Sequence, residues 1–123
     1  AKALTDVFPH LEGKIGGAGI RVPVVCGSMT DITCTLRKNA SADEINSAFQ
    51  KAASAEMKNI LEYTNDPIVS ADIVGNPYSC IFDAQLTSSL GKTAKVVGWY
   101  DNETGYSNRL TDLAEVLFSK VAV

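Results

Sequence analysis

The chain has 123 residues, of which 46% are hydrophobic and 20% are charged, and its formal net charge at pH 7 is −3. This composition is ordinary for one globular domain, spanning 1–123, with a core of its own. The acidic balance argues against a nucleic-acid surface, which needs clustered Lys and Arg. No apolar run approaches the roughly 18 residues of a membrane span. We therefore expect neither a nucleic acid nor a membrane as partner.

The cysteines and the single histidine offer little evidence for catalysis. Cys26, Cys34 and Cys80 form no CxxC pair and are odd in number, which favours free thiols and a reducing, cytoplasmic location. Cys34 and Cys80 fall in apolar strand patterns, where cysteine usually packs as a core residue, whereas Cys26 is expected to be more exposed. His10 is the single histidine, and one histidine with scattered cysteines is poor evidence for a metal site. We expect no metal.

In the first third of the chain, one helix end and two strands are expected. Residues 1–8 are typical of the end of a helix that stops near Pro9. Residues 14–22 have apolar positions of a strand, although four glycines nearby suggest a bulge or a close backbone approach. Residues 30–36 alternate strictly and predict a half-buried strand. Its inward face would carry Thr30, Ile32, Cys34 and Leu36.

The middle of the chain contains the clearest helix signal. Ser41 and Glu44 stand at the spacing of a capping box, in which each side chain bonds the other residue's backbone N–H. The residues that follow repeat at helical spacing and should face the core: Ile45, Ala48, Phe49, Ala52 and Ala53. Another short helical turn is expected over 57–63.

The second half is expected to be rich in strands and to end in a helix. A turn is expected at 64–67. Short strands are expected at 68–69, 73–74, 80–82, 86–90 and 94–100. Residues 106–121 predict a final helix with Leu110, Leu113, Leu117 and Val121 inward. Because strands outnumber helices and most connections are too short for helical crossovers, the fold class is α+β, a mainly antiparallel mixed sheet with helices on one face.

Two places concentrate polar groups suited to ligand binding. Arg21 follows a flexible stretch and could clamp a phosphate or carboxylate bidentately, or form a structural salt bridge. Residues 99–109 join a strand to a helix and carry amides, charges and aromatic rings. They could form a ligand site. They could equally form a packed corner, with the tyrosines buried, Asp101 capping the helix and Glu103 paired with Arg109.

Five stretches, in order along the chain, resemble the glyceraldehyde-3-phosphate dehydrogenase family. They are Leu11-x-Gly13-Lys14, Arg21-Val22-Pro23, Thr64-x-Asp66-Pro67-Ile68-Val69-Ser70-x-Asp72, Ile81-Phe82-Asp83-Ala84 and Tyr100-Asp101-Asn102-Glu103-x-Gly105-Tyr106-Ser107-Asn108-Arg109. The resemblance implies the C-terminal portion of a catalytic domain. We expect the N-terminal Rossmann domain that binds NAD to be absent, as are the catalytic histidine and the family's Ser-Cys-Thr-Thr-Asn nucleophile motif. The chain, which begins at Ala1, is thus expected to be an excised or processed piece without activity of its own.

The resemblance also implies roles for individual residues. Arg21 would bind the substrate phosphate, Asn102 would hydrogen-bond the nicotinamide carboxamide, Tyr106 would line the nicotinamide and Tyr100 would pack near the catalytic cysteine. No residue of this chain inherits a catalytic role. Thr104 stands where the family often has an aromatic residue, and residues 24–28 depart from its commoner Thr-Pro-Asn-Val-Ser form.

The implied whole enzyme is a glycolytic homotetramer. It oxidises its phosphorylated aldehyde with NAD and uses inorganic phosphate to release 1,3-bisphosphoglycerate. Two alternatives stay open: an erythrose-4-phosphate dehydrogenase, and a non-catalytic domain for oligomerisation or partner binding. The choice between NAD and NADP is also open.

Overall fold

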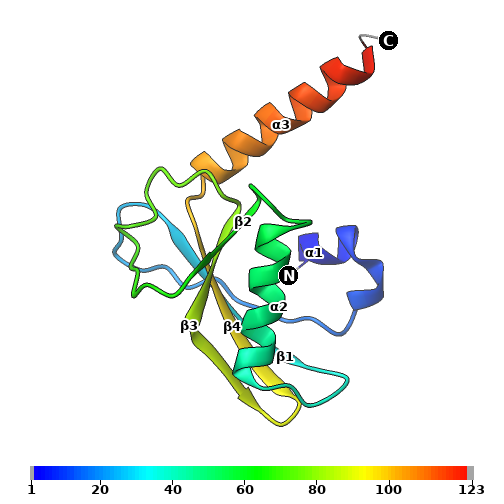
Figure 1. The fold of residues 1–123 in the computed structure, drawn as a ribbon, viewed down its shortest axis with the longest axis vertical. Helices are drawn as coiled ribbons and strands as arrows, with labels where there is room; N and C mark the ends of the chain where they lie inside the picture. Colours follow the sequence, from blue (N-terminus) through cyan, green and yellow to red (C-terminus); the bar gives the residue numbers. More distant parts are fainter. Residues whose placement is uncertain (1, 122–123) are drawn as a thin grey trace.

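A computed structural model describes residues 2–121 of the chain (Figure 1). Its elements are, in order, α1 (Lys2–Val7), a 3₁₀ turn (Pro9–Leu11), β1 (Ser28–Thr35), α2 (Ala42–Ser54), β2 (Leu61–Thr64), β3 (Cys80–Leu90), β4 (Thr93–Tyr100) and α3 (Thr104–Val121). The four strands form one sheet in the order β1-β4-β3-β2. The expected α+β class with a mainly antiparallel mixed sheet is confirmed.

The central strand β4 organises the sheet. It pairs antiparallel with β3 on one side and with β1 on the other, while β2 and β3 form the parallel pair. The β3–β4 hairpin turns at Gly91, whose φ of 61° lies in the left-handed region that glycine adopts without steric cost. The register sets Ser28 opposite Tyr100, so the start of β1 lies beside the end of β4.

Helix α2 covers one face of the sheet and closes the core. Its expected capping box is confirmed: Glu44 N donates to Ser41 Oγ at 3.2 Å, and Ser41 N donates to Glu44 Oε2 at 2.7 Å. The buried residues beneath it are Leu61, Phe82 and Ala84, against which Ile45, Phe49, Ala52 and Ala53 pack. Ala48, expected to face the core, is exposed.

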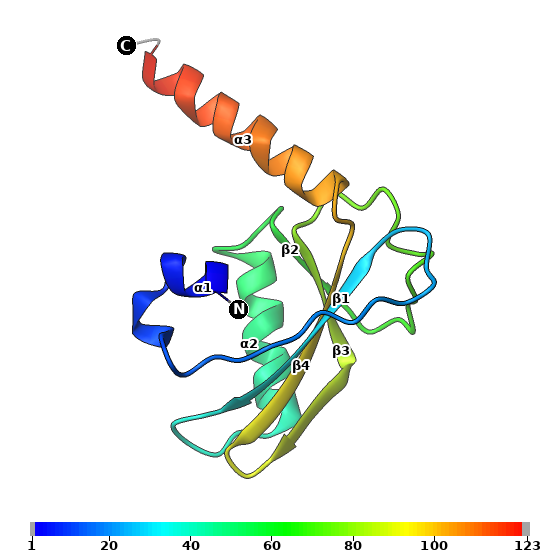
Figure 2. The same ribbon diagram turned by 180° about the vertical axis from the view of Figure 1, so that it is seen from behind.

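The opposite face of the sheet is covered in part by irregular chain. Side chains alternate along a strand, so Ile81 and Val97 face away from Phe82. Both are buried, as is Ile73 in the turns before β3. Seen from behind, the segment that precedes β1 runs across this face (Figure 2). The two faces therefore have different covers, one a helix and the other a loop.

Several expected strands are absent from the structure. Residues 14–22 form no strand: they are irregular and, apart from the half-buried Ile15, exposed, and their glycines disfavour extended pairing. Residues 68–69 and 73–74 lie in loop and turn. The helical turn expected over 57–63 is confirmed for 57–60, where Leu61 N donates to the carbonyl of Met57 at 2.9 Å, whereas 61–63 form β2. The strands expected at 80–82 and 86–90 are two parts of β3, with an irregularity between Asp83 and Ser88.

The sequence predicts the position of β1 along the chain correctly, but it does not predict that the strand is exposed. It is an edge strand, and every residue after Ser28 is exposed in the described chain. Cys34, expected in the core, is therefore at the surface, whereas Cys80 packs against the core cluster. Strict alternation predicts which residues share a face, but it does not show whether another element covers that face.

Helix α3 forms as expected, but its apolar positions do not face inward. Leu110, Leu113, Leu117 and Val121 are 49–80% exposed, and Gly105 is the helix's one buried residue. Both views show the helix projecting away from the sheet (Figures 1 and 2). Its apolar stripe thus has no facing element within residues 2–121. None of the described helices has the length and apolar character needed to cross a membrane.

Replacing Phe82 with Ala should lower the free energy of unfolding by about 3–5 kcal/mol. The Phe82 ring stacks on that of Phe49 at a centroid distance of 4.0 Å and is 2% exposed, so its removal leaves a cavity. Urea unfolding of the 123-residue chain measures the loss. Leu90→Ala, at a side chain that is 84% exposed, is the control and should cost less than about 0.5 kcal/mol. Equal losses in the two variants would contradict this description of the core.

Candidate functional site

The end of β4 is fixed by the buried carboxylate of Asp101. Its Oδ1 accepts hydrogen bonds from Glu103 N at 2.9 Å and Thr104 N at 2.8 Å, and its Oδ2 accepts one from Gly75 N at 2.9 Å. The side chain therefore caps the start of α3 and ties it to the turn before β3. Bonds from Thr104 and Gly75 to the charged form lower the pKa of Asp101 to about 2.

The backbone also passes very close to itself at the first turn of α3. A Cβ added to Gly105 would lie 2.7 Å from the carbonyl oxygen of Tyr78. Since real Cβ contacts are not that short, only glycine fits here without a backbone shift. Gly105 thus permits the close packing of α3 on the segment that leads into β3.

Asn102 lies in the turn between β4 and α3, and its amide is oriented by a residue far away in the sequence. Ser28 Oγ donates to Asn102 Oδ1 at 2.8 Å. The bond leaves Nδ2 of Asn102 without a partner among residues 2–121, and the side chain is exposed. Asn102 therefore presents two N–H donors to a ligand.

Of the other side chains in 99–109, some are exposed and others form contacts within the chain. Tyr106 is 66% exposed in the first turns of α3, so its ring is available to a ligand. Arg109 forms an ion pair with Asp112 at 2.8 Å and donates to the carbonyl of Asn59, rather than pairing with Glu103. The packed-corner hypothesis is therefore correct for Asp101 as a cap and wrong for the burial of Tyr106 and for the Glu103–Arg109 pair.

Arg21 lies in the irregular segment that precedes β1. It is exposed, and within the described chain it forms no ion pair, so the alternative of an internal salt bridge is not supported. The residues that follow Arg21 in the sequence help to line a hollow of about 280 Å³, together with residues of the loop after β2 and of the end of β4. These include Val22, Ser28, Val69, Ser70 and Trp99. The fold therefore brings the Arg21 segment, residues 67–72 and the end of β4 to one place.

Cys26 lies against the same turn. Its Sγ lies 3.8 Å from Asp101 Oδ2 and 3.9 Å from Glu103 Oε2, so its single S–H can donate to either carboxylate. Burial, followed by the negative charge of Asp101, raises the pKa of the Cys26 thiol, which makes it a weak nucleophile at neutral pH. The three groups lie within 4.8 Å of one another, as metal ligands could. However, Asp101 already accepts three N–H bonds, and the start of a helix disfavours a cation.

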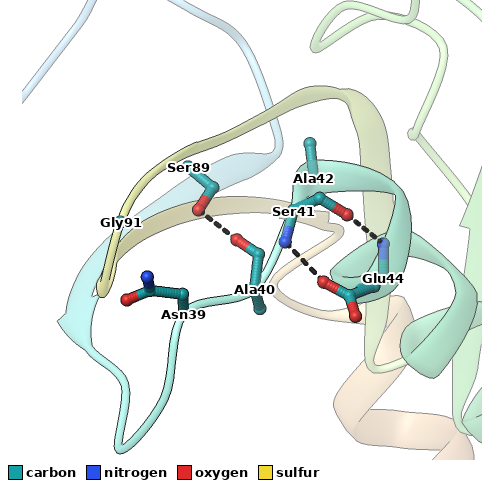
Figure 3. Close-up of a pocket in the computed structure, with 7 residues that line it drawn as sticks. All are labelled: Asn39, Ala40, Ser41, Ala42, Glu44, Ser89 and Gly91. Carbon is teal, nitrogen blue, oxygen red and sulfur yellow. Dashed lines mark hydrogen bonds between the residues drawn. The ribbon is translucent and has the colours of Figure 1, made fainter.

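A second, larger hollow of about 410 Å³ lies at the other end of the sheet (Figure 3). It is lined by the start of α2 and the β3–β4 hairpin. Its polar groups bond one another: Ser89 Oγ donates to the carbonyl of Ala40, and Ser41 and Glu44 form the capping box. Because these groups are used in holding the helix start, we assign this hollow a structural role.

Two residues of this site were not expected from the sequence as ligand-site components. Ser28 was not singled out, since the 74 positions that separate it from Asn102 leave no local signal. Asp101 was expected only as a helix cap, and its bond to Gly75 depends on the tertiary fold. The pairing of β1 with β4 produces the first contact, and the turn before β3 produces the second.

Comparison with known proteins gives consistent matches. The family model for the C-terminal domain of glyceraldehyde 3-phosphate dehydrogenase matches residues 1–102. Glyceraldehyde-3-phosphate dehydrogenase 1 of Streptomyces avermitilis is 54% identical over 93% of this chain and 34% of its own length. Glyceraldehyde-3-phosphate dehydrogenase of Mycobacterium avium is 53% identical over 95% of this chain and 34% of its own length. Glyceraldehyde-3-phosphate dehydrogenase 2 of Streptomyces arenae is 51% identical over 98% of this chain and 36% of its own length. The chain thus spans about a third of the length of these relatives.

Asp101→Asn should lower the free energy of unfolding at neutral pH and should make it less dependent on pH in the acid range. The folded-state pKa of about 2 lies below the ordinary value of 3.8, so the stabilisation is complete above pH 3.8 and is lost as the pH falls to about 2. Urea-unfolding midpoints measured across this window test the prediction. The wild-type midpoint should fall more steeply than that of the variant, so the two curves converge in acid. Parallel curves would show that Asp101 does not carry this linkage. Asp6→Asn, exposed on α1, is the control.

Proposed function

The chain belongs to the glyceraldehyde 3-phosphate dehydrogenase C-terminal domain family, and from this membership we propose that it supplies one wall of the active site of an NAD-dependent, phosphorylating dehydrogenase. The observation that carries the proposal is the oriented amide of Asn102, whose free donors stand in the exposed turn beside the hollow near Arg21. The wall would position substrate and cofactor for groups from the rest of the subunit.

Arg21 is proposed to bind the phosphate of the aldehyde substrate. A guanidinium offers donors in a planar fork that matches a phosphate. The exposure of Arg21 and its lack of an ion pair within 2–121 support the role, because the charge is not used internally. The irregular segment gives the side chain room to reach a ligand.

Asn102 and Tyr106 are proposed to hold the nicotinamide end of NAD. When bound, NAD accepts a hydride from the substrate. The residues fit the group, because a carboxamide needs a donor for its carbonyl oxygen and the ring needs a flat neighbour. Asn102 Nδ2 is a free donor, and Tyr106 is 66% exposed at the adjacent helix start. Together they would fix the rotation of the ring and hence the face presented to substrate.

The chemical step is proposed to depend on residues beyond this wall. The Ser-Cys-Thr-Thr-Asn motif that carries the family's nucleophile does not occur in the 123 residues. Cys26 does not replace it, since its pKa is raised by burial and by Asp101. Arg21, Asn102 and Tyr106 would therefore contribute binding and orientation rather than bond making.

The names of the relatives favour this activity over the two alternatives. All three relatives described above are glyceraldehyde-3-phosphate dehydrogenases, rather than erythrose-4-phosphate dehydrogenases or non-catalytic domains. We further propose a cytoplasmic, glycolytic homotetramer. The exposed apolar stripe of α3 supports further packing in the whole protein, since such a stripe is normally covered.

Arg21→Ala in the intact dehydrogenase should cost about 2–5 kcal/mol in kcat/KM for glyceraldehyde 3-phosphate, the scale of a lost charged contact. Unphosphorylated glyceraldehyde should be oxidised equally by variant and wild type, because it has no phosphate to lose. Arg37→Ala, at an exposed arginine in the connection between β1 and α2, is the matched control. Unchanged kinetics with the phosphorylated substrate would remove Arg21 from the site.

The purified 123-residue chain should not reduce NAD with glyceraldehyde 3-phosphate and inorganic phosphate. It holds positioning groups without the family's nucleophile motif. The absorbance of NADH measures the reaction, and an intact family enzyme serves as the positive control. Turnover by the chain alone would overturn the assignment of purely positioning roles.

A further inference from the structure

We propose that Glu103 makes the cofactor site favour the oxidised nicotinamide, which carries a positive charge, over the reduced nicotinamide, which is neutral. The carboxylate attracts the ring of NAD, and this attraction disappears once the ring has accepted a hydride from the substrate. The inference rests on the proposed function, since it assumes that the ring lies between Asn102 and Tyr106. It adds a residue that responds to the charge of the cofactor rather than to its shape.

Glu103 stands between the two residues that are proposed to hold the ring. It follows Asn102 directly in the turn after β4, and Tyr106 follows one helical turn later. The carbonyl of Glu103 accepts a helical bond from Ser107 N at 3.0 Å, so the geometry of α3 already includes Glu103. Side chains three residues apart on a helix are neighbours, with their Cβ atoms about 5–6 Å apart. The carboxylate therefore belongs to the same small surface as the Asn102 amide and the Tyr106 ring.

The side chains of Asn102 and Glu103 also turn toward the same neighbouring segment. Asn102 Oδ1 lies 2.8 Å from Ser28 Oγ, and Glu103 Oε2 lies 3.9 Å from Cys26 Sγ. One residue separates Cys26 from Ser28, a span of about 7 Å at most in an extended chain. The amide and the carboxylate therefore lie on the same side of the turn. A ring that contacts the amide lies close to the charge.

The charge of Glu103 is not neutralised by a basic side chain within residues 2–121. Neither of the ion pairs found in this part of the chain includes Glu103. The first basic residue along α3 is Arg109, whose guanidinium lies 2.8 Å from the carboxylate of Asp112 and donates to the carbonyl of Asn59. Because the Glu103 side chain is also exposed, its charge can act on a ligand.

Asp101 adds a second carboxylate to the turn but is unsuited to testing the effect of charge. It is only 4% exposed, and its three backbone bonds hold the start of α3, so its replacement would disturb the fold as well as the charge. The contact described for the Glu103 side chain is the weak one with the thiol of Cys26. The charge of Glu103 can therefore be removed with little structural change.

The two redox forms of the cofactor isolate the charge of the ring. They share the same adenosine and pyrophosphate groups and differ at the nicotinamide, which is positive in NAD and neutral in NADH. A distorted site weakens the binding of both forms, whereas the loss of a nearby negative charge weakens the binding of NAD alone. The ratio of the two dissociation constants therefore reports the effect of the Glu103 charge separately from any structural effect.

The test measures the dissociation constants of NAD and NADH by calorimetric titration of the intact dehydrogenase carrying Glu103→Gln. Loss of one charge about 7 Å from the ring, in the high dielectric of an exposed site, predicts binding of NAD that is weaker by about three- to tenfold. Binding of NADH should be unchanged. Glu103→Asp keeps the charge and should keep the wild-type ratio. Glu115→Gln, at an exposed position farther along α3, is the control and should leave both constants unchanged. In about 1 M salt, where the Debye length is about 3 Å, the difference between Glu103→Gln and wild type should largely disappear.

Asn102→Ala separates this inference from the proposed function. If Asn102→Ala weakens cofactor binding but Glu103→Gln leaves the ratio of the two constants unchanged, the role of Glu103 is overturned while the cofactor role of Asn102 stands. If Asn102→Ala changes neither constant, both are overturned. A loss confined to NAD in Glu103→Gln, absent from Glu103→Asp and reduced by salt, supports the inference. A shift of the ratio that also occurs in Glu103→Asp, or that persists in high salt, would contradict it.

Discussion

The arrangement of the candidate site depends on one buried carboxylate. Asp101 accepts backbone hydrogen bonds from Gly75, Glu103 and Thr104, so it joins the end of β4, the start of α3 and the turn before β3. Because the three donors satisfy its charge, it remains ionised although it is only 4% exposed. The direction of α3 and the position of Asn102 both follow from this contact, together with the β1–β4 pairing that sets Ser28 opposite Tyr100.

The chain is well packed at its sheet and open at the candidate site. Phe82 and its neighbours form a closed core under α2, while Arg21, Asn102 and Tyr106 stand exposed. This division suits a scaffold that presents binding groups to ligands and to other parts of a larger protein. The span of about a third of the relatives' length agrees with it.

Local patterns predicted the elements whose causes are local. The capping box at Ser41 and Glu44, the alternation of β1 and the apolar run of β4 each depend on neighbouring residues, and their positions are correct. Burial was harder to predict, because an amphipathic helix such as α3 has the same pattern whether its partner lies within these residues or elsewhere. The Ser28–Asn102 bond could not be found at all, since it arises from strand register rather than from either segment. The family motifs indicated Arg21, Asn102 and Tyr106 as candidates but not how their atoms are oriented.

The central proposal is that Asn102 of this chain holds the carboxamide of the cofactor. A crystal structure of the intact dehydrogenase with NAD bound tests it most directly. The account predicts Asn102 Nδ2 within hydrogen-bond distance of the carboxamide oxygen, with Ser28 Oγ on Oδ1 and the Tyr106 ring beside the nicotinamide. A carboxamide held by other groups, with Asn102 turned away from it, would contradict the account.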